Sequence, residues 1–280
     1  MPVANNRSNK LVAIVVPLHA RDYLTEDEQI ALRHIHHHLG KYDKFILVPE
    51  GSTFNLPGFR SIPVGMQYFG SARAHNRLLL KPEFYEQFSE YEFMLIHHLD
   101  AFALSDQLER YCAMGYDYIG PPWIHDPDIP PDQRVGNGGF SLRKIASLTH
   151  FLRVYRSRIH IPRRLGAQKL VGKLLGYIRL PAVSEKLWEA IQGGINEDRV
   201  IGRCATYYCP EFKIAPENIA LGFAFEGNPY VCLARNGDQL PFGVHGWNRD
   251  GRDYWAQFFV PANDPPPPTE PAAVAQPCPA

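Results

Sequence analysis

The chain has 280 residues, of which 45% are hydrophobic and 12% aromatic, so it can bury one large core or two small ones. Its 29 basic residues balance its 29 acidic residues. Domains held on nucleic acid by bulk charge carry a basic excess, so this balance excludes them and leaves room only for a small local phosphate site.

Cysteine usage and the chain ends bear on the compartment. The five cysteines are odd in number and include no Cys-x-x-Cys pair, which predicts buried thiols rather than a disulfide framework or a zinc knuckle. The first ten residues are polar and lack the apolar core of a signal peptide, and no apolar run is long enough to span a bilayer. We expect a cytoplasmic protein, and peripheral association with the inner face of the membrane stays open.

The N-terminal part predicts a strand–helix–strand unit. The apolar, branched run 11–16 is typical of a buried parallel strand. Thr25 and Glu28 form a capping box for a helix that stops at Gly40, and the run 45–48 is a second buried strand. This order indicates an α/β architecture.

The alternation continues along the chain. Two further strands are expected at 93–96 and 116–119. Helices are expected at 71–80, 82–88, from Ser105 to about 115, at 144–154, at 199–207 and near 254–259.

We expect one folded domain over residues 11–260. Residues 1–10 are predicted to be a flexible leader, and the Pro- and Ala-rich residues 261–280 a disordered tail. The stretch 155–183 is basic and dotted with glycine, which favours a helical insertion around 155–190 that lies over a binding site.

Asp100 is the first candidate for chemistry, because it ends the segment His98-Leu99-Asp100 directly after a predicted strand. Ligands of open α/β sheets bind beyond the carboxyl ends of the strands. A carboxylate there can hold Mn²⁺ or Mg²⁺, which bridges nucleotide phosphates, and Mn²⁺ also accepts imidazole. His98 points to the same face of an extended chain. The structural alternative is that Asp100 only caps the next turn.

His245 lies in an apolar run and is followed by Trp247. A lone histidine in such a run is usually a core residue, so His245 gains functional weight only as a partner of Asp100. Trp247 can stack on a sugar or a base, or fill the core.

Other polar and glycine residues have paired readings. Glu197 and Asp198 open a helix, where they either complement its dipole or supply a general base. Asn76 and Arg77 either hold a sugar hydroxyl and a phosphate or line a solvated helix face. The adjacent glycines Gly138 and Gly139 indicate backbone that passes very close to another group, such as a ligand. The histidines at 34, 36, 37 and 38 lie on a predicted helix and are expected at the surface.

These segments, in this order, resemble the family catalogued as domain of unknown function 5672, which is grouped with glycosyltransferases of the GT-A type. The resemblance covers about residues 11–260. The matching stretches are Val12–Pro17, Leu24–Glu28, Leu39–Lys44, Asn76–Leu80, Pro82–Tyr85, Leu99–Ala101, Gly115–Gly120, Gly136–Arg143, Asn196–Asp198 and Phe242–Trp247.

The resemblance implies a single GT-A-like, Rossmann-like domain with a mixed, mostly parallel central sheet flanked by helices. It also implies transfer of a sugar from a nucleotide-diphosphate sugar to a hydroxyl of a carbohydrate or other acceptor. The expected donor is a UDP-sugar. In GT-A enzymes an Asp-x-Asp motif at a strand end binds the metal through its last Asp. Here the motif is His98-Leu99-Asp100, so only its second acid matches.

The resemblance also assigns roles to single residues. Asp100 and His245 become the metal ligands, and Asp198, with Glu197 second, becomes the base of an inverting reaction, with a retaining one left open. The residues expected to bind the donor are Pro17, Asn76, Arg77, His98, Asp100, Gly138, Gly139 and Trp247.

Three other functions compete. A sugar nucleotidyltransferase would need a Gly-rich phosphate loop after the first strand, and the sequence 17–21 is not one. A metal-dependent phosphohydrolase would show more clustered carboxylates and histidines. A non-catalytic nucleotide-sugar or carbohydrate-binding module is the main alternative, and the incomplete Asp-x-Asp motif leaves it open.

Overall fold

The computed structural model describes residues 10–19, 21, 23–124, 136–164 and 196–262. The expected leader, the expected tail and most of the expected insertion around 155–190 lie outside these residues. None of the helices within the described ranges combines the length and the apolar character that crossing a membrane requires.

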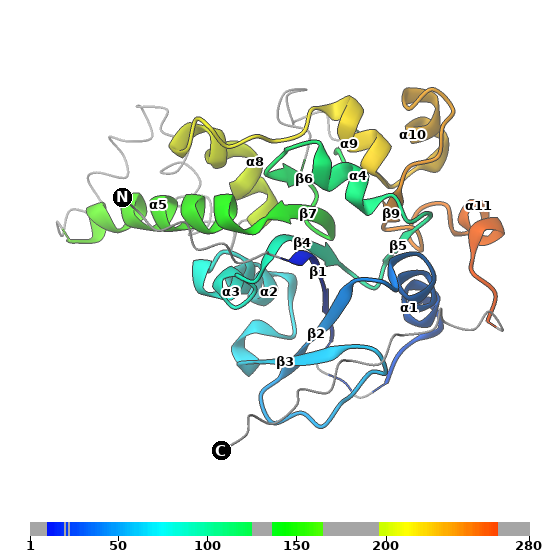
Figure 1. Cartoon of the computed structure of the whole chain (residues 1–280), viewed down its shortest axis with the longest axis horizontal. Coiled ribbons are helices and arrows are strands. Elements are labelled where there is room, and N and C mark those ends of the chain that lie inside the picture. Colours follow the sequence, from blue (N-terminus) through cyan, green and yellow to red (C-terminus); the bar gives the residue numbers. More distant parts are fainter. Residues whose placement is uncertain (1–9, 20, 22, 125–135, 165–195, 263–280) are drawn as a thin grey trace, which may run out of the picture.

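A six-stranded sheet in the order β3-β2-β1-β4-β7-β6 forms the centre of the molecule (Figure 1). The first four strands of this order run parallel, and β7 runs antiparallel to both of its neighbours. The strands are β1 (Lys10–Pro17), β2 (Asp43–Pro49), β3 (Arg60–Val64), β4 (Tyr91–His97), β6 (Tyr118–Ile119) and β7 (Phe140–Lys144). The predicted mixed, mostly parallel sheet is therefore confirmed.

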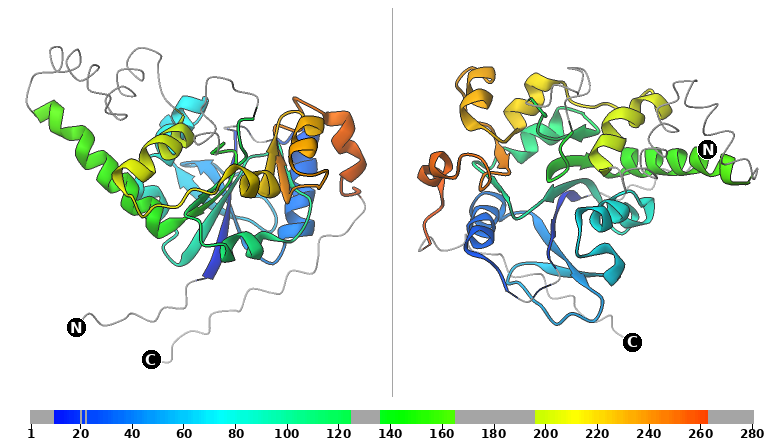
Figure 2. Two further views of the ribbon diagram at one scale, coloured as in Figure 1. Left: turned by 90° about the horizontal axis from the view of Figure 1, so that it is seen from above. Right: turned by 180° about the vertical axis from the view of Figure 1, so that it is seen from behind.

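Two helical layers cover the sheet (Figures 1 and 2). The face that carries Ile14 packs on α1 (Glu26–Leu39), α4 (Leu108–Ala113) and α9 (Glu217–Phe223). The face that carries Val15 packs on α2 (Ala72–Leu79), α3 (Pro82–Glu86), α5 (Ile145–Arg164) and α8 (Glu197–Tyr208). Both faces of β1 are buried, which explains its unbroken apolar sequence.

A second, three-stranded sheet in the order β5-β9-β8 extends one side of the molecule. It consists of β5 (Ala101–Ala103), β9 (Gly243–His245) and β8 (Ala224–Glu226). The remaining short elements are η1 (Met66–Tyr68), α10 (Pro229–Arg235), α11 (Arg252–Trp255) and η3 (Ala256–Phe258). Sequence patterning missed all three strands of this sheet, because three buried residues give no readable period, and it also missed β3.

Two local predictions can be compared directly with the helix starts. The capping box of α1 is present, since Thr25 and Glu28 each bond the other's backbone N–H group. Ser105, however, does not cap α4. That helix begins at Leu108 after Gln107, with no side-chain cap.

The histidine-rich stretch corrects another expectation. His34 is fully buried rather than at the surface. Its Nδ1 lies 2.7 Å from the carbonyl oxygen of Ala103, and its Nε2 accepts the N–H of Val260 at 3.1 Å. Burial lowers the pKa of His34 to about 4, so the neutral ring joins α1 to β5 and to the last described segment.

Candidate functional site

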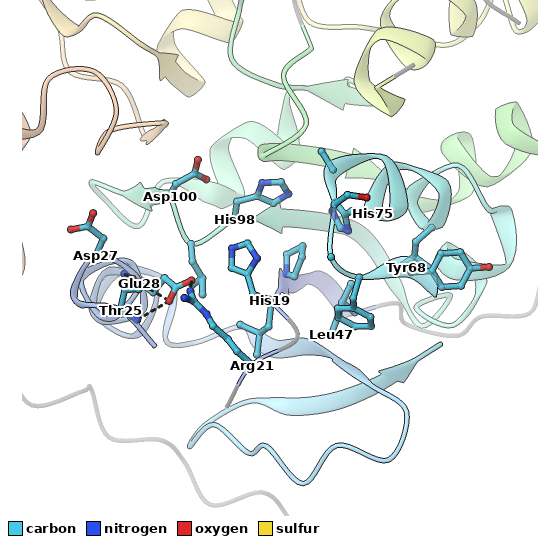
Figure 3. A pocket seen from close by; sticks show the side chains of 18 of the residues that line it. His19, Arg21, Thr25, Asp27, Glu28, Leu47, Tyr68, His75, His98 and Asp100 are labelled. Carbon is cyan, nitrogen blue, oxygen red and sulfur yellow. Dashed lines mark hydrogen bonds and ion pairs between the residues drawn. The ribbon is translucent and has the colours of Figure 1, made fainter. Parts of the chain in front are cut away.

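A pocket of about 880 Å³ opens at the carboxyl ends of β1 and β4 (Figure 3). On one side its wall is formed by residues at or just after the ends of these strands, including Pro17, His19, His98 and Asp100. The first turn of α1 and the segment from η1 to α2 complete the wall. This is the edge at which open α/β sheets bind their ligands.

The small sheet brings three potential metal ligands together at this edge. Ala101 of β5 is paired with His245 of β9, and the N–H of Gly246 donates to the carbonyl oxygen of Asp100 at 2.8 Å. As a result His98, Asp100 and His245 offer ligand atoms within 4.8 Å of one another. His245 Nε2 lies 3.2 Å from Asp100 Oδ1.

Glu226 fixes the orientation of His245. The two residues are paired in the β8–β9 register, and Glu226 Oε2 lies 2.5 Å from His245 Nδ1. A carboxylate on one ring nitrogen directs the other toward a metal and raises its basicity. Glu226 was not among the predicted residues. It ends a three-residue strand more than 100 residues from Asp100, and only the tertiary pairing reveals it.

Charge in this group is divided between its members. Burial acts to lower the pKa of His245, but the carboxylates of Glu226 and Asp100 outweigh it and raise the pKa to about 10. Burial acts to raise the pKa of Asp100, and its contact with His245 nevertheless brings it well below the usual range. Burial lowers the pKa of His98 to about 3, so its imidazole is neutral.

The donor set fits a divalent cation. Nε2 of His98 is buried and has no hydrogen-bond partner among the described residues, and the buried Nε2 of His245 faces Asp100 Oδ1 at 3.2 Å. A carboxylate together with two imidazole nitrogens suits Mn²⁺ better than Mg²⁺, which prefers oxygen ligands. Arg249 lies 3.7 Å from Asp100 and 3.5 Å from Glu226, which partly offsets the negative charge of these two carboxylates.

Gly138 and Gly139 pass against this group immediately before β7. Because β7 is antiparallel to β4, its start lies beside the end of β4, and the carbonyl oxygen of Gly139 accepts the N–H of His98 at 2.7 Å. A Cβ atom on Gly139 would lie 2.0 Å from His245 Nε2, and one on Gly138 would lie 2.2 Å from Glu197 Oε1. At both positions a side chain larger than hydrogen would collide with a neighbouring side chain, so glycine is required.

We expect Gly139→Ala to weaken Mn²⁺ binding by more than about tenfold, because the added methyl displaces His245 from its place beside Asp100. Isothermal titration with Mn²⁺ measures this. Gly222→Ala is the matched control, since a Cβ there makes only an ordinary contact with Tyr111 at 3.5 Å. Equal Mn²⁺ affinity in both variants would show that the methyl is accommodated elsewhere.

The two adjacent carboxylates at the start of α8 have different surroundings. Glu197 is buried and pairs with the fully buried Arg143, whose Nη2 lies 2.8 Å from Glu197 Oε1. Asp198 accepts the N–H of Gly138 at 3.0 Å and that of Arg199 at 2.6 Å. Burial, followed by repulsion from Glu197, raises the pKa of Asp198 to about 7. A pKa near 7 suits Asp198 to taking up a proton near neutrality.

Arg143 is an internal tie between several elements. Besides Glu197 it donates to the hydroxyl of Tyr85 at 2.7 Å, to Ser141 Oγ at 2.9 Å and to the carbonyl oxygen of Gly138 at 3.2 Å. These contacts join α3, β7 and α8. Through its bond to the carbonyl oxygen of Gly138, Arg143 also holds the glycine segment in place.

Arg143→Met is expected to lower the free energy of unfolding by about 3–5 kcal/mol, because it leaves Glu197 buried without its cation. Urea unfolding followed by circular dichroism measures the loss. Lys144→Met, at the half-exposed neighbour, should change stability by less than about 1 kcal/mol. Adding Glu197→Gln to Arg143→Met should recover part of the loss, and no recovery would mean that packing rather than charge dominates.

The other predicted donor-binding residues separate into two groups. Pro17 lines the pocket. Asn76 instead donates to Asn196 Oδ1 at 2.9 Å, and Arg77 donates to the carbonyl oxygen of Gln67 at 2.8 Å. Trp247 is fully buried in the core around the small sheet. Asn76, Arg77 and Trp247 therefore contact other parts of the fold, and none of them lines the pocket.

Comparison with known proteins supplies a family model and several solved structures. A model of the family described as "Protein of unknown function (DUF5672)" matches residues 59–245. A search of curated protein sequences finds no match.

Several solved structures resemble the chain at low identity. The galactosyltransferase LgtC, solved with donor and acceptor sugar analogues, shares 13% identity at a TM-score of 0.52, over 89% of this chain and 98% of that one. A glycosyltransferase for the major capsid of PBCV-1 has 8% identity and a TM-score of 0.47, over 89% and 98% of the two chains. The apo form of GlyE from Streptococcus pneumoniae TIGR4 has 11% identity and a TM-score of 0.48, and this chain covers 60% of it with 89% of its own length. The LgtC match shows that the fold is that of GT-A glycosyltransferases.

Proposed function

The chain belongs to the DUF5672 family of proteins of unknown function, and from this premise and its GT-A fold we propose that it is a nucleotide-sugar-dependent glycosyltransferase. It would transfer a sugar from a nucleotide-diphosphate donor to a hydroxyl of a carbohydrate or other acceptor. We propose a UDP-sugar as the donor. The LgtC structure contains donor and acceptor sugar analogues, which supports this class of substrates. We place the reaction in the cytoplasm, with the inner face of the membrane as one site of action.

One observation carries the proposal. His98, Asp100 and His245 converge at the strand ends, and His98 and Asp100 line a pocket of about 880 Å³, a size that suits a small-molecule ligand. In our proposal these three side chains hold Mn²⁺ or Mg²⁺. The bound cation would neutralise the charge that develops on the departing diphosphate.

The proposed base is Asp198, in an inverting reaction. Two backbone N–H groups hold its carboxylate in place, and its raised pKa suits proton uptake from an acceptor hydroxyl. It also bonds the glycine segment that abuts His245, which supports a role close to the cation. Glu197, the second residue predicted for this role, is neutralised by Arg143 and is better suited to positioning.

A binding module without catalysis is the second candidate. The ion pair of Glu197 with Arg143 favours it, because this carboxylate already has a structural partner. Under this reading the pocket binds a nucleotide sugar and leaves it intact.

A panel of nucleotide sugars tested with Mn²⁺ separates the two candidates. The enzyme reading predicts a raised melting temperature with at least one donor, together with hydrolysis or transfer. A raised melting temperature without turnover, with a range of hydroxyl acceptors present, would favour the binding module. If no donor shifts the melting temperature and none is turned over, both candidates are wrong.

A further inference from the structure

A second cluster of metal-ligating side chains lies away from the pocket, where α5 meets the end of α8. His150, Cys209 and Glu211 offer one nitrogen, one sulfur and one oxygen atom within 4.8 Å of one another. None of these three residues lines the pocket, and none belongs to the group around Asp100.

The fold holds these three donors in place. Cys209 and Glu211 belong to one tight turn after α8, which is closed by a bond from the N–H of Phe212 to the carbonyl oxygen of Cys209 at 2.9 Å. The ring of Phe212 packs on Phe151 of α5 at a centroid distance of 5.9 Å, and Phe151 is the neighbour of His150. The turn and the packing of these two rings therefore bring the three donors together.

The three donors differ in exposure. Cys209 is buried, whereas Glu211 and His150 are exposed. A divalent cation at this point would bind the thiolate of Cys209 and the carboxylate of Glu211 together.

We propose that His150, Cys209 and Glu211 form a second metal site, which binds Zn²⁺. Zn²⁺ is bound in proteins by this combination of imidazole, thiolate and carboxylate ligands. Three protein ligands leave a fourth position for water, and the two exposed residues keep that position open to solvent. A bound ion would clamp the end of α8 to α5 and so stabilise the helix that carries Asp198 at its start.

Titration of the metal-free full-length protein with Co²⁺ tests the site. Co²⁺ bound to a thiolate gives a charge-transfer absorption in the near ultraviolet, and the group around Asp100 contains no thiolate, so the two sites are distinguished. We expect this absorption in the wild type, its displacement by Zn²⁺, and its loss in Cys209→Ser. The control variant Cys232→Ser removes another buried thiol and should keep the charge-transfer absorption.

A second variant keeps the test independent of folding. His150 is exposed, so His150→Gln should fold normally and bind Co²⁺ more than about tenfold more weakly, since changes outside the first ligand shell alone cost that much. The site is refuted if the wild type shows no charge-transfer absorption, or if the absorption persists with unchanged affinity in Cys209→Ser or His150→Gln. Neither result bears on donor binding in the pocket.

Discussion

Replacing Asp100 with alanine is expected to abolish Mn²⁺-dependent donor binding and to lower turnover by at least about three orders of magnitude. Asp100 supplies the carboxylate of a group whose other two members are imidazoles, so its loss removes the anionic ligand of the cation. Charge neutralisation by a metal is worth several kcal/mol in a transition state, and each 1.4 kcal/mol is about a factor of ten in rate. Isothermal titration of a UDP-sugar with and without Mn²⁺ measures the binding.

The matched control for this variant is Asp106→Ala, which removes an exposed carboxylate from the loop after β5. It should bind donor and Mn²⁺ like the wild type. Because Asp100 also contacts His245, the melting temperature of Asp100→Ala should be recorded beside the titration. A folded Asp100→Ala protein that retains Mn²⁺-dependent donor binding would refute the proposed metal ligand.

Asp198→Asn is expected to lower kcat by about 10²–10⁴ while donor affinity stays within a few fold, since general base catalysis contributes about this much. The amide keeps the shape of the carboxylate but cannot take up a proton. In the wild type, kcat should rise with pH through about 7, where Asp198 loses its proton, and this rise should be absent in the variant. Transfer assays over pH 5 to 9 test both expectations. Asp253→Asn, at an exposed carboxylate of α11, serves as the control.

Asp198 should also make the free energy of unfolding depend on pH, in the opposite direction to kcat. The pKa of Asp198 is raised from 3.8 to about 7 on folding, so between these values the native state binds more protons than the unfolded state. The stabilising contribution is complete below about pH 4 and is lost as the pH rises through about 7. Urea unfolding should show this loss in the wild type and not in Asp198→Asn. A kcat that is unaffected by the substitution would leave Asp198 with a structural role only.

The sequence predicted the fold well where signals are local and strong. Buried parallel strands read as unbroken apolar runs, and the capping box of α1 names its own helix start. These two features, with the resemblance, were enough for the α/β assignment, and the family and the GT-A fold are confirmed.

The candidate site was less accessible, because it depends on contacts between distant segments. His34 reads as surface from its polar neighbours, yet two backbone partners from other segments bury it. Glu226 carries no motif and acquires its position only through the β8–β9 register. Arg143 looked like part of a glycine-rich stretch, and nothing in the sequence pairs it with Glu197. Asp100 and His245, in contrast, were predicted as partners and do lie together.

The strand order also constrains how the molecule is assembled. β1 is flanked by β2 and by β4, and β4 begins about 80 residues after β1. Until Phe93 pairs with Val12, one edge of β1 is open and apolar, a condition that invites pairing with other chains. Contacts of such large sequence separation slow folding. A nascent chain that ends before β4 therefore has no completed core, and the pocket edge can form only after the residues around His245 have been synthesised.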